Sequence, residues 1–119
     1  MQQSNLIKDI VVDIERITKE INQLLNEGNE FDNSLIDVIS ELYDMREIYL
    51  LNLQNWYNSP EGMSVLSNNR DKWQKIISTV IEIDNQNLEI IQSQVFEKSN
   101  KLKNLTKQKS LLIYSQGNL

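Results

Sequence analysis

Residues that break helices are scarce in this chain. It holds three glycines and one proline in 119 residues, with Gly28 in NEGNEFDNS, Pro60 and Gly62 in NSPEG, and Gly117 near the end. Between these breaks the apolar residues recur at intervals of three and four, which is the pattern of amphipathic helices. The sequence therefore predicts an all-α fold, an antiparallel three- to four-helix bundle with a long C-terminal helix.

The composition limits the chemistry open to the chain. Its length of 119 residues fits one domain, residues 1–119. Cysteine and histidine are both absent, which removes disulfides, histidine bases and nearly all transition-metal sites, and the sequence contains no glycine-rich phosphate loop. We therefore expect a protein that is not an enzyme, with no catalytic residue, metal or cofactor. No apolar run is long enough to cross a membrane, so we also expect a cytoplasmic protein without a membrane partner.

Two long helices are predicted before the proline. The first covers about residues 4–26, and the second covers about 33–57 with Asn33 or Ser34 as its N-cap. Steps of three and four in the first helix are typical of the seam of a helical bundle. The expected buried stripe of the first helix is Ile7, Ile10, Ile14, Ile17, Ile21 and Leu24. That of the second is Leu35, Ile39, Leu42, Arg46, Tyr49, Leu53 and Trp56, with an apolar face widened by Ile36, Val38, Tyr43, Ile48 and Leu50.

The turn at NSPEG separates these helices from the rest of the chain. Ser59 is the expected N-cap of a short helix that begins with Pro60 and ends near residue 67. From residue 71 to residue 115 there is no glycine or proline, and a single helix of that length would extend roughly 65 Å. This segment either projects from the bundle or bends back as a fourth helix near Ser99, and we favour the bend.

Three aromatic residues, Trp56, Tyr57 and Trp73, flank the same turn. One interpretation is a small core that covers this end of the bundle. The other is a protein-binding patch, because tryptophan and tyrosine are favoured at interfaces. The sequence leaves both interpretations open.

One charged residue lies on each of two stripes that should be buried. The second helix carries Arg46, and the third has the stripe Ile77, Ile81, Asp84, Leu88, Ile91 and Val95. If these two helices pack as an antiparallel pair, the register set by the turn between them places Arg46 opposite Asp84. An unpaired buried charge is strongly destabilising, whereas a hydrogen-bonded pair roughly breaks even. We therefore predict a structural buried ion pair that fixes the register, and the alternative is that both side chains reach the bundle edge and never meet.

Positive charge is concentrated at the C-terminal end. The net charge is -5, yet residues 98–119 contain no acidic residue and hold Lys98, Lys101, Lys103, Lys107 and Lys109. The acidic remainder of the chain makes nucleic acid a poor partner. The apolar face of this basic segment is sparse and consists of Val95, Leu102, Leu105 and Leu112. The segment is either an ordinary last helix with a solvated face, or a mobile cover that a partner peptide could displace from a groove.

Three motifs together resemble those of the FliT-type flagellar export chaperones. They are a glycine turn among acidic residues at NEGNEFDNS, the step VIEIDNQNLEIIQ, and the lysine-rich end LTKQKSLLIYSQ. The matching positions, over about residues 5–115, are Gly28, Arg46, Asp84, Lys107, Lys109 and Tyr114. Phe31 lies three positions after the turn glycine and Gln108 separates the final lysines. Because both depart from the FliT pattern, the similar FlgN-type chaperones are the near alternative.

The resemblance implies a cytoplasmic chaperone of flagellar type III export. Such a protein would bind a flagellar export substrate, the filament-cap protein or a hook-associated protein, prevent its premature assembly and pass it to the export machinery. The resemblance also implies an apolar groove partly covered by the last helix, with Ile91, Val95, Leu102, Leu105, Leu112 and Tyr114 as its residues. A second function class stays open, a structural or self-associating bundle that acts as a homodimer, scaffold or adaptor without chaperone activity.

Overall fold

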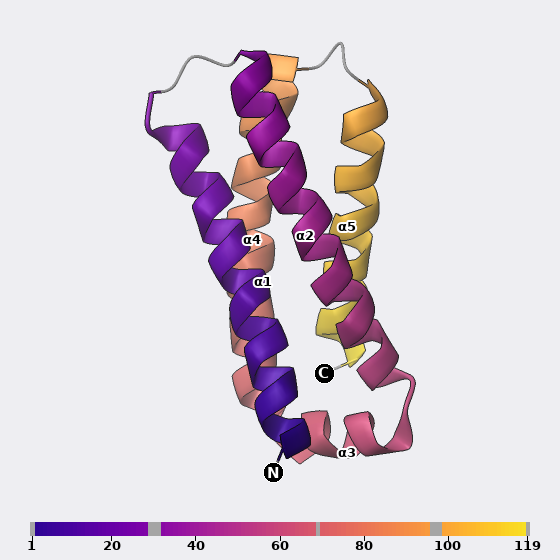
Figure 1. Cartoon of the computed structure of the whole chain (residues 1–119). Coiled ribbons are helices and arrows are strands. Elements are labelled where there is room, and N and C mark those ends of the chain that lie inside the picture. The colour runs from indigo at the N-terminus through magenta and orange to yellow at the C-terminus, as the bar shows by residue number, and fades with distance from the viewer. Residues whose placement is uncertain (1, 29–31, 69, 96–98, 119) are drawn as a thin grey trace.

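Five helices appear in the computed structural model, which describes the backbone of residues 2–28, 32–68, 70–95 and 99–118 (Figure 1). Side chains are described for residues 8–28, 32–56, 58–64, 67–68, 70–93 and 107–116. The helices are α1 (Gln2–Asn26), α2 (Asn33–Tyr57), α3 (Pro60–Asn68), α4 (Arg70–Val95) and α5 (Ser99–Asn118). The described backbone contains no strand, so the predicted all-α fold is confirmed.

The four long helices form a bundle in which some neighbours are parallel. α1 and α4 run toward one end, α2 and α5 run toward the other, and the short α3 crosses the lower end (Figure 1). Around the bundle, α1 contacts α2 and α4, and α5 contacts the same two helices. Over their described residues α2 and α4 make no close backbone contact with each other, so they face each other across the diagonal.

This arrangement corrects the prediction that the helices over 33–57 and 71–95 are direct neighbours. The two helices do run antiparallel, but α3 separates the end of α2 from the start of α4 (Figure 1). A helix of 9 residues spans about 13 Å, which is enough to carry the chain across the end of the bundle. A tight turn would instead have joined adjacent helices.

The segment after residue 70 is two helices rather than one. α4 ends at Val95 and α5 begins at Ser99, so the predicted bend near Ser99 is confirmed. α5 packs beside α2 and α4 and runs back along the bundle (Figure 1). The link, residues 96–98, lies outside the described residues. The fold is therefore a four-helix bundle with one additional short helix.

A side-chain cap fixes the start of α2. Asp32 is the N-cap, because its Oδ1 accepts the backbone N–H of Leu35 at 2.9 Å. The predicted caps, Asn33 and Ser34, are wrong, since both are already helical. In the preceding turn Gly28 has a φ of +76°, a conformation that glycine adopts without steric strain. The cap thus lies nearer to the turn glycine than predicted.

The start of α3 comes very close to the end of α2. Ser59 caps α3 as predicted, because its Oγ accepts the backbone N–H of Gly62 at 3.0 Å, and Pro60 is the first helical residue. Gly62 is buried, and a Cβ atom at this position would overlap the backbone carbonyl of Trp56. The close approach of the two helix ends therefore requires glycine here.

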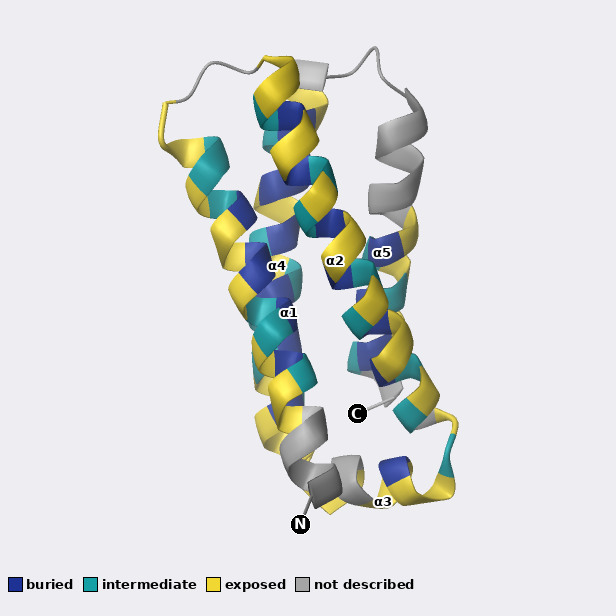
Figure 2. Cartoon of the chain, in the orientation of Figure 1, coloured by how far each residue is buried: buried dark blue, intermediate teal, exposed yellow. Residues whose placement is uncertain are grey.

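The core consists of two apolar clusters along the bundle, formed by the inward faces of the helices (Figure 2). The cluster near α3 consists of Val11, Ile14, Leu50, Leu53, Trp73, Ile77, Val80 and Leu112. The cluster toward the opposite end consists of Ile17, Ile21, Ile36, Ile39, Tyr43, Leu88 and Ile91. On α2 and α4, buried polar residues lie between the two clusters in chain order, Arg46 on α2 and Asp84 with Asn87 on α4.

The core face of α2 is rotated from the predicted stripe. Three residues that were predicted only to widen its apolar face are buried in the core, and they are Ile36, Tyr43 and Leu50. Tyr49, predicted at the centre of the stripe, is half-buried, and Val38 and Ile48 are exposed. The reason is that α2 packs against both α1 and α5, so its most buried side chains point between these two helices.

The aromatic residues beside α3 contribute to the core. Trp73 is 2% exposed in the cluster near α3, and Trp56 packs against that cluster. The side chain of Tyr57 lies outside the described residues. Of the two interpretations that the sequence left open, the structure favours a core at this end of the bundle.

We expect Gly62→Ala to lower the free energy of unfolding by roughly 2 kcal/mol, because the added methyl group overlaps a backbone carbonyl of α2. Ser64→Ala, at an exposed position of the same helix, is the matched control and should change the stability by less than about 0.5 kcal/mol. Urea unfolding followed by circular dichroism measures both. Equal stabilities of the two variants would contradict the close approach of α2 and α3.

Candidate functional site

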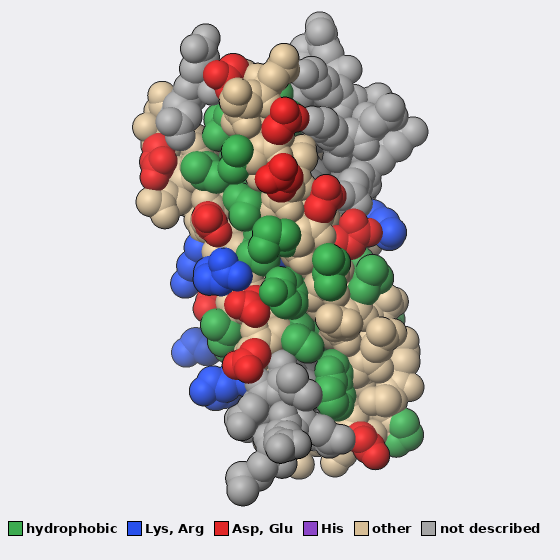
Figure 3. Space-filling view, viewed as in Figure 1, with side chains coloured by type: hydrophobic (Ala, Val, Ile, Leu, Met, Phe, Trp, Pro, Cys, Tyr) green, Lys and Arg blue, Asp and Glu red, His purple; other side chains and the backbone are tan. Residues whose placement is uncertain are grey.

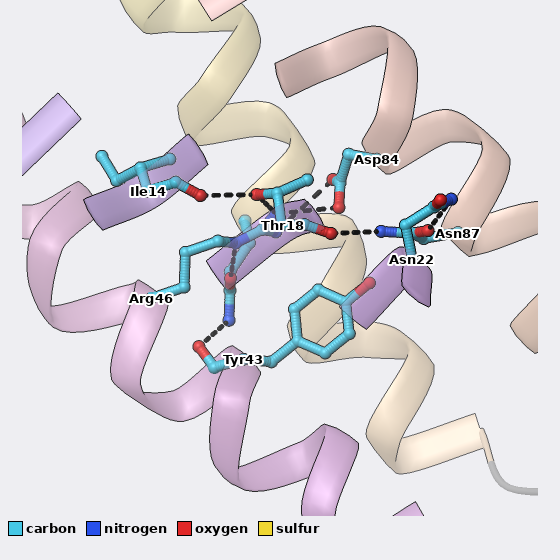
Figure 4. Close-up of polar contacts among 8 residues, drawn as sticks. Ile14, Thr18, Asn22, Tyr43, Arg46, Asp84 and Asn87 are labelled. Atoms are coloured by element: carbon cyan, nitrogen blue, oxygen red, sulfur yellow. Dashed lines mark hydrogen bonds and ion pairs between the residues drawn. The ribbon is translucent and has the colours of Figure 1, made fainter. Parts of the chain in front are cut away.

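The centre of the bundle is polar. Thr18 from α1, Arg46 from α2, Asp84 from α4 and Gln108 from α5 meet there, and each is at most 1% exposed. We call these four residues the polar layer. Figure 4 shows Thr18, Arg46 and Asp84 converging from three helices. A polar group buried between apolar clusters has to find its hydrogen bonds within the protein.

Arg46 donates hydrogen bonds to all three other helices of the polar layer. Its Nη1 donates to Asp84 Oδ1 at 2.8 Å and to Thr18 Oγ1 at 3.0 Å. Its Nη2 lies 3.4 Å from Asp84 Oδ2, and its Nε donates to Gln108 Oε1 at 2.9 Å. The structure thus brings Arg46 and Asp84 together in the predicted register, although across the diagonal of the bundle. One guanidinium therefore links every long helix.

A second set of hydrogen bonds continues the polar layer between α1 and α4. Thr18 Oγ1 donates to Ile14 O at 2.8 Å, so its lone pairs are available to accept from Arg46. Asn87 Nδ2 donates to Thr18 O at 3.2 Å, and Asn22 Nδ2 donates to Asn87 Oδ1 at 2.8 Å (Figure 4). The sequence prediction did not include Thr18 or Asn87. Asn87 could have been found, because a residue three positions after a buried one lies on the same helix face.

Gln108 connects α5 to the polar layer. Its Oε1 accepts the Nε–H of Arg46, and its Nε2 donates to the backbone carbonyl of Tyr43 at 2.9 Å. Both ends of the amide are therefore bonded at a position with 0% exposure. In the sequence Gln108 stood out only as the residue between two lysines, and its burial was not predicted.

Few apolar side chains hold the described part of α5. Its buried residues there are Gln108, Leu112 and Ser115, of which only Leu112 is apolar. At the surface, Lys107 Nζ lies 3.2 Å from Glu47 Oε1, and Gln116 Nε2 donates to Ser78 Oγ at 2.8 Å. A solvent-exposed ion pair contributes little to stability. Over residues 107–116, α5 therefore contacts the bundle through the buried Leu112, the half-buried Leu111 and the hydrogen bonds of Gln108 and Gln116.

Tyr43 lies beside the polar layer with an unpaired hydroxyl. Its ring faces Arg46, whose Cζ is 4.8 Å from the ring centroid. Burial first, and then the negative charge of Asp84, hold the pKa of Tyr43 well above its ordinary value of 10.0. The hydroxyl has no hydrogen-bond partner in the described part of the chain, so Asp84 acts on it by charge rather than by a bond of good geometry.

The residues expected in an apolar groove do not form one exposed surface. Ile91 is 5% exposed in the cluster far from α3, whereas Leu112 is 0% exposed in the cluster near α3. Tyr114 is 43% exposed on α5. The remaining three side chains lie outside the described residues and are those of Val95, Leu102 and Leu105. With α5 in this position, the core covers Ile91 and Leu112, and of the described residues in this set only Tyr114 is accessible.

Other kinds of functional site leave few signs in the described residues. No group of three acidic side chains among them could hold a metal ion. An open depression of about 410 Å³ lies between α1 and the end of α2, lined by Ile10, Asn52, Asn55, Trp56 and Ser59. No helix, over its described residues, has the length and apolar character needed to span a membrane.

No family model, curated protein or solved structure matches the chain at a significant level.

Replacing one member of the buried pair should cost much more than replacing both. We expect Arg46→Met and Asp84→Leu each to lower the free energy of unfolding by roughly 3–5 kcal/mol, because each leaves an uncompensated charge in the core. The double variant should lose far less than the sum of the two. A double-mutant cycle by urea unfolding measures this coupling, and a coupling near zero would contradict the pairing. The exposed pair Arg16–Asp13 is the control and should show less than about 1 kcal/mol.

Tyr43→Phe tests the unpaired hydroxyl. Its removal should raise the free energy of unfolding by up to about 1 kcal/mol, because no hydrogen bond is lost. Because the pKa of Tyr43 is higher in the folded than in the unfolded chain, the folded chain keeps this proton to a higher pH. The titration of Tyr43 therefore leaves the free energy of unfolding unchanged below pH 10.0 and lowers it as the pH rises above that value. Above it, the unaltered chain should lose about 1.4 kcal/mol per pH unit more than Tyr43→Phe in urea unfolding. Equal slopes would contradict the burial of this hydroxyl.

Proposed function

We propose that this protein is a cytoplasmic export chaperone that binds an apolar segment of a partner protein in place of its own last helix. The observation that carries the proposal is a mismatch between α5 and the surface beneath it. The described part of α5 contributes one fully buried side chain, Leu112, and the half-buried Leu111, whereas α2 and α4 bury Leu50, Leu53, Ile77 and Val80 in the same cluster. A helix with a fuller apolar face would fit this surface better than α5 does.

Displacement of α5 would open a groove between α2 and α4. Across their described residues these helices make no close backbone contact, and α5 packs against both of them. A partner helix entering from this side would meet the apolar cluster near α3. It would also meet Arg46, which loses its bond to Gln108 when α5 leaves. A partner with a glutamine or a carboxylate at this level is therefore favoured, because it would replace the lost acceptor.

The class of cargo is proposed from the resemblance to FliT-type chaperones, which rests on the matching positions between Gly28 and Tyr114. The cargo would be a flagellar export substrate, the filament-cap protein or a hook-associated protein. The chaperone would cover its apolar segment, prevent premature assembly and release it to the export machinery. Burial of an apolar helix in such a groove is favourable because it removes apolar surface from water.

A second candidate function is a self-associating scaffold or adaptor. The observation in its favour is a set of exposed large apolar side chains on α2, which are Val38, Met45, Ile48 and Leu51. Gathered apolar side chains at a surface indicate contact with another protein. This function would use the outer face of α2 and leave α5 in place, so it differs from the first in what happens to α5.

The test is binding to the C-terminal segment of a filament-cap protein, measured by isothermal titration calorimetry. We expect weak binding by the unaltered chain and binding at least about tenfold tighter by Leu112→Ala. The reason is that removing a buried leucine side chain costs roughly 2–5 kcal/mol of docking and so weakens the competition from α5. Ile113→Ala, at a position that is 50% exposed on the same helix, is the matched control and should bind like the unaltered chain.

Equal binding by all three chains would contradict the displacement of α5. Binding by none of them, nor by a chain that lacks residues 98–119, would contradict the chaperone function itself. Circular dichroism at the titration temperature checks that each variant remains folded.

A further inference from the structure

An apolar row runs along the outer face of α2, away from the core. Ile48 is 62% exposed, the highest value among the large apolar side chains of the described residues. Met45 and Leu51, three positions before and after it, are 45% and 41% exposed. Figure 3 shows apolar side chains beside a line of acidic ones over this part of the bundle. Large apolar side chains spaced evenly about Ile48 indicate a contact surface centred on that residue.

Charge is distributed unevenly about Ile48. The exposed acidic residues of this face all precede it at helical spacing and are Asp37, Glu41 and Asp44. The exposed residues that follow include two neutral amides, Asn52 and Asn55. Arg46 is the only basic residue of α2, and its guanidinium is buried beside Asp84 and does not reach the surface. The face thus has an acidic half and an amide half, with an apolar centre between them.

We propose that this face is a two-fold interface, in which α2 packs antiparallel against α2 of a second copy of the chain with Ile48 at the axis. One helical turn from the axis, Met45 lies at the level of Leu51 of the partner subunit. About two turns away, Glu41 lies at the level of Asn55 of the partner subunit, and an amide can donate a hydrogen bond to a carboxylate. A two-fold interface has to be self-complementary, and the two unlike halves of this face meet that condition.

Other occupants fit this face less well. A parallel pair of α2 helices would place each carboxylate beside its own copy, and like charges at that spacing repel. A basic amphipathic helix from another protein would find carboxylates along only half of its length, because no acidic residue follows Glu47 in α2. A second copy in the antiparallel orientation uses both halves equally.

The interface is separate from the groove of the proposed function. It uses the outer face of α2, whereas the groove lies on the inner face, where the core residues of α2 are buried. Either proposal can therefore fail without the other. A single pair of helices buries less surface than a standard stable interface, so the dimer should form in a concentration-dependent manner.

A cysteine cross-link tests the axis, because the chain contains no cysteine of its own. In Ile48→Cys the two thiols lie at the axis, and mild oxidation should convert most of the protein to a disulfide-linked dimer. Val38→Cys is the matched control, since Val38 is 46% exposed on the same helix but far from the axis. Its two copies would lie roughly 30 Å apart and should not link. Equal dimer yields from the two variants would overturn the interface.

A mixture of two further variants tests the orientation. Glu41→Cys and Asn55→Cys should form a disulfide with each other when mixed and should form little dimer alone. Efficient linking of Glu41→Cys to itself would overturn the antiparallel arrangement. Circular dichroism of each variant before oxidation checks that the bundle is intact.

Sedimentation equilibrium provides a measurement without cross-linking. The unaltered chain should dimerise, and Ile48→Asp, at an exposed position, should raise the dissociation constant at least about tenfold. A chain that is monomeric at its highest soluble concentration would overturn the proposal. So would Ile48-dependent binding of a synthetic lysine-rich amphipathic peptide to a chain that stays monomeric.

Discussion

The buried contact between Arg46 and Asp84 is the interaction on which the arrangement of this bundle depends. The guanidinium donates to Asp84, to Thr18 and to Gln108, and so fixes the levels of all four long helices at one point. A shift of any helix by one turn would leave a charge or an amide against hydrocarbon, at a cost of several kcal/mol per group. Since such a pair adds little net stability compared with apolar residues, we interpret its role as selecting this register over others.

The same guanidinium makes the position of α5 depend on the core. Gln108 is bonded on both sides of its amide, while Leu112 is the only apolar side chain that the described part of α5 buries. Over residues 107–116 the last helix is thus placed by the hydrogen bonds of Gln108 as well as by Leu112 and the half-buried Leu111. The proposed function requires a partner helix that offers an acceptor at the level of Arg46 and more apolar surface than α5 does over residues 107–116. This links the interior of the bundle to the proposed chaperone function.

Much of this structure could be predicted from the sequence because glycine and proline divide the chain so clearly. The bounds of α2 and the cap at Ser59 follow from local patterns, and the meeting of Arg46 with Asp84 follows from the register of two antiparallel apolar stripes. The diagonal relation of α2 and α4 could not be predicted, because an apolar stripe gives register and direction but does not distinguish a neighbour from a helix across the core. The burial of Gln108 was missed for a related reason, since its partners lie on α2, far away in sequence.

The exchange of arginine Nε protons with water, followed by NMR of nitrogen-15 labelled protein, measures whether the guanidinium of Arg46 is bonded and shielded from water in the polar layer. Arg16 and Arg70 are exposed, whereas Arg46 is 0% exposed and donates its Nε–H to Gln108. We expect one slowly exchanging Nε signal, lost in Arg46→Lys, beside two that exchange rapidly. Three signals that exchange equally fast would show that water reaches the polar layer and that Arg46 does not hold the four helices in this register.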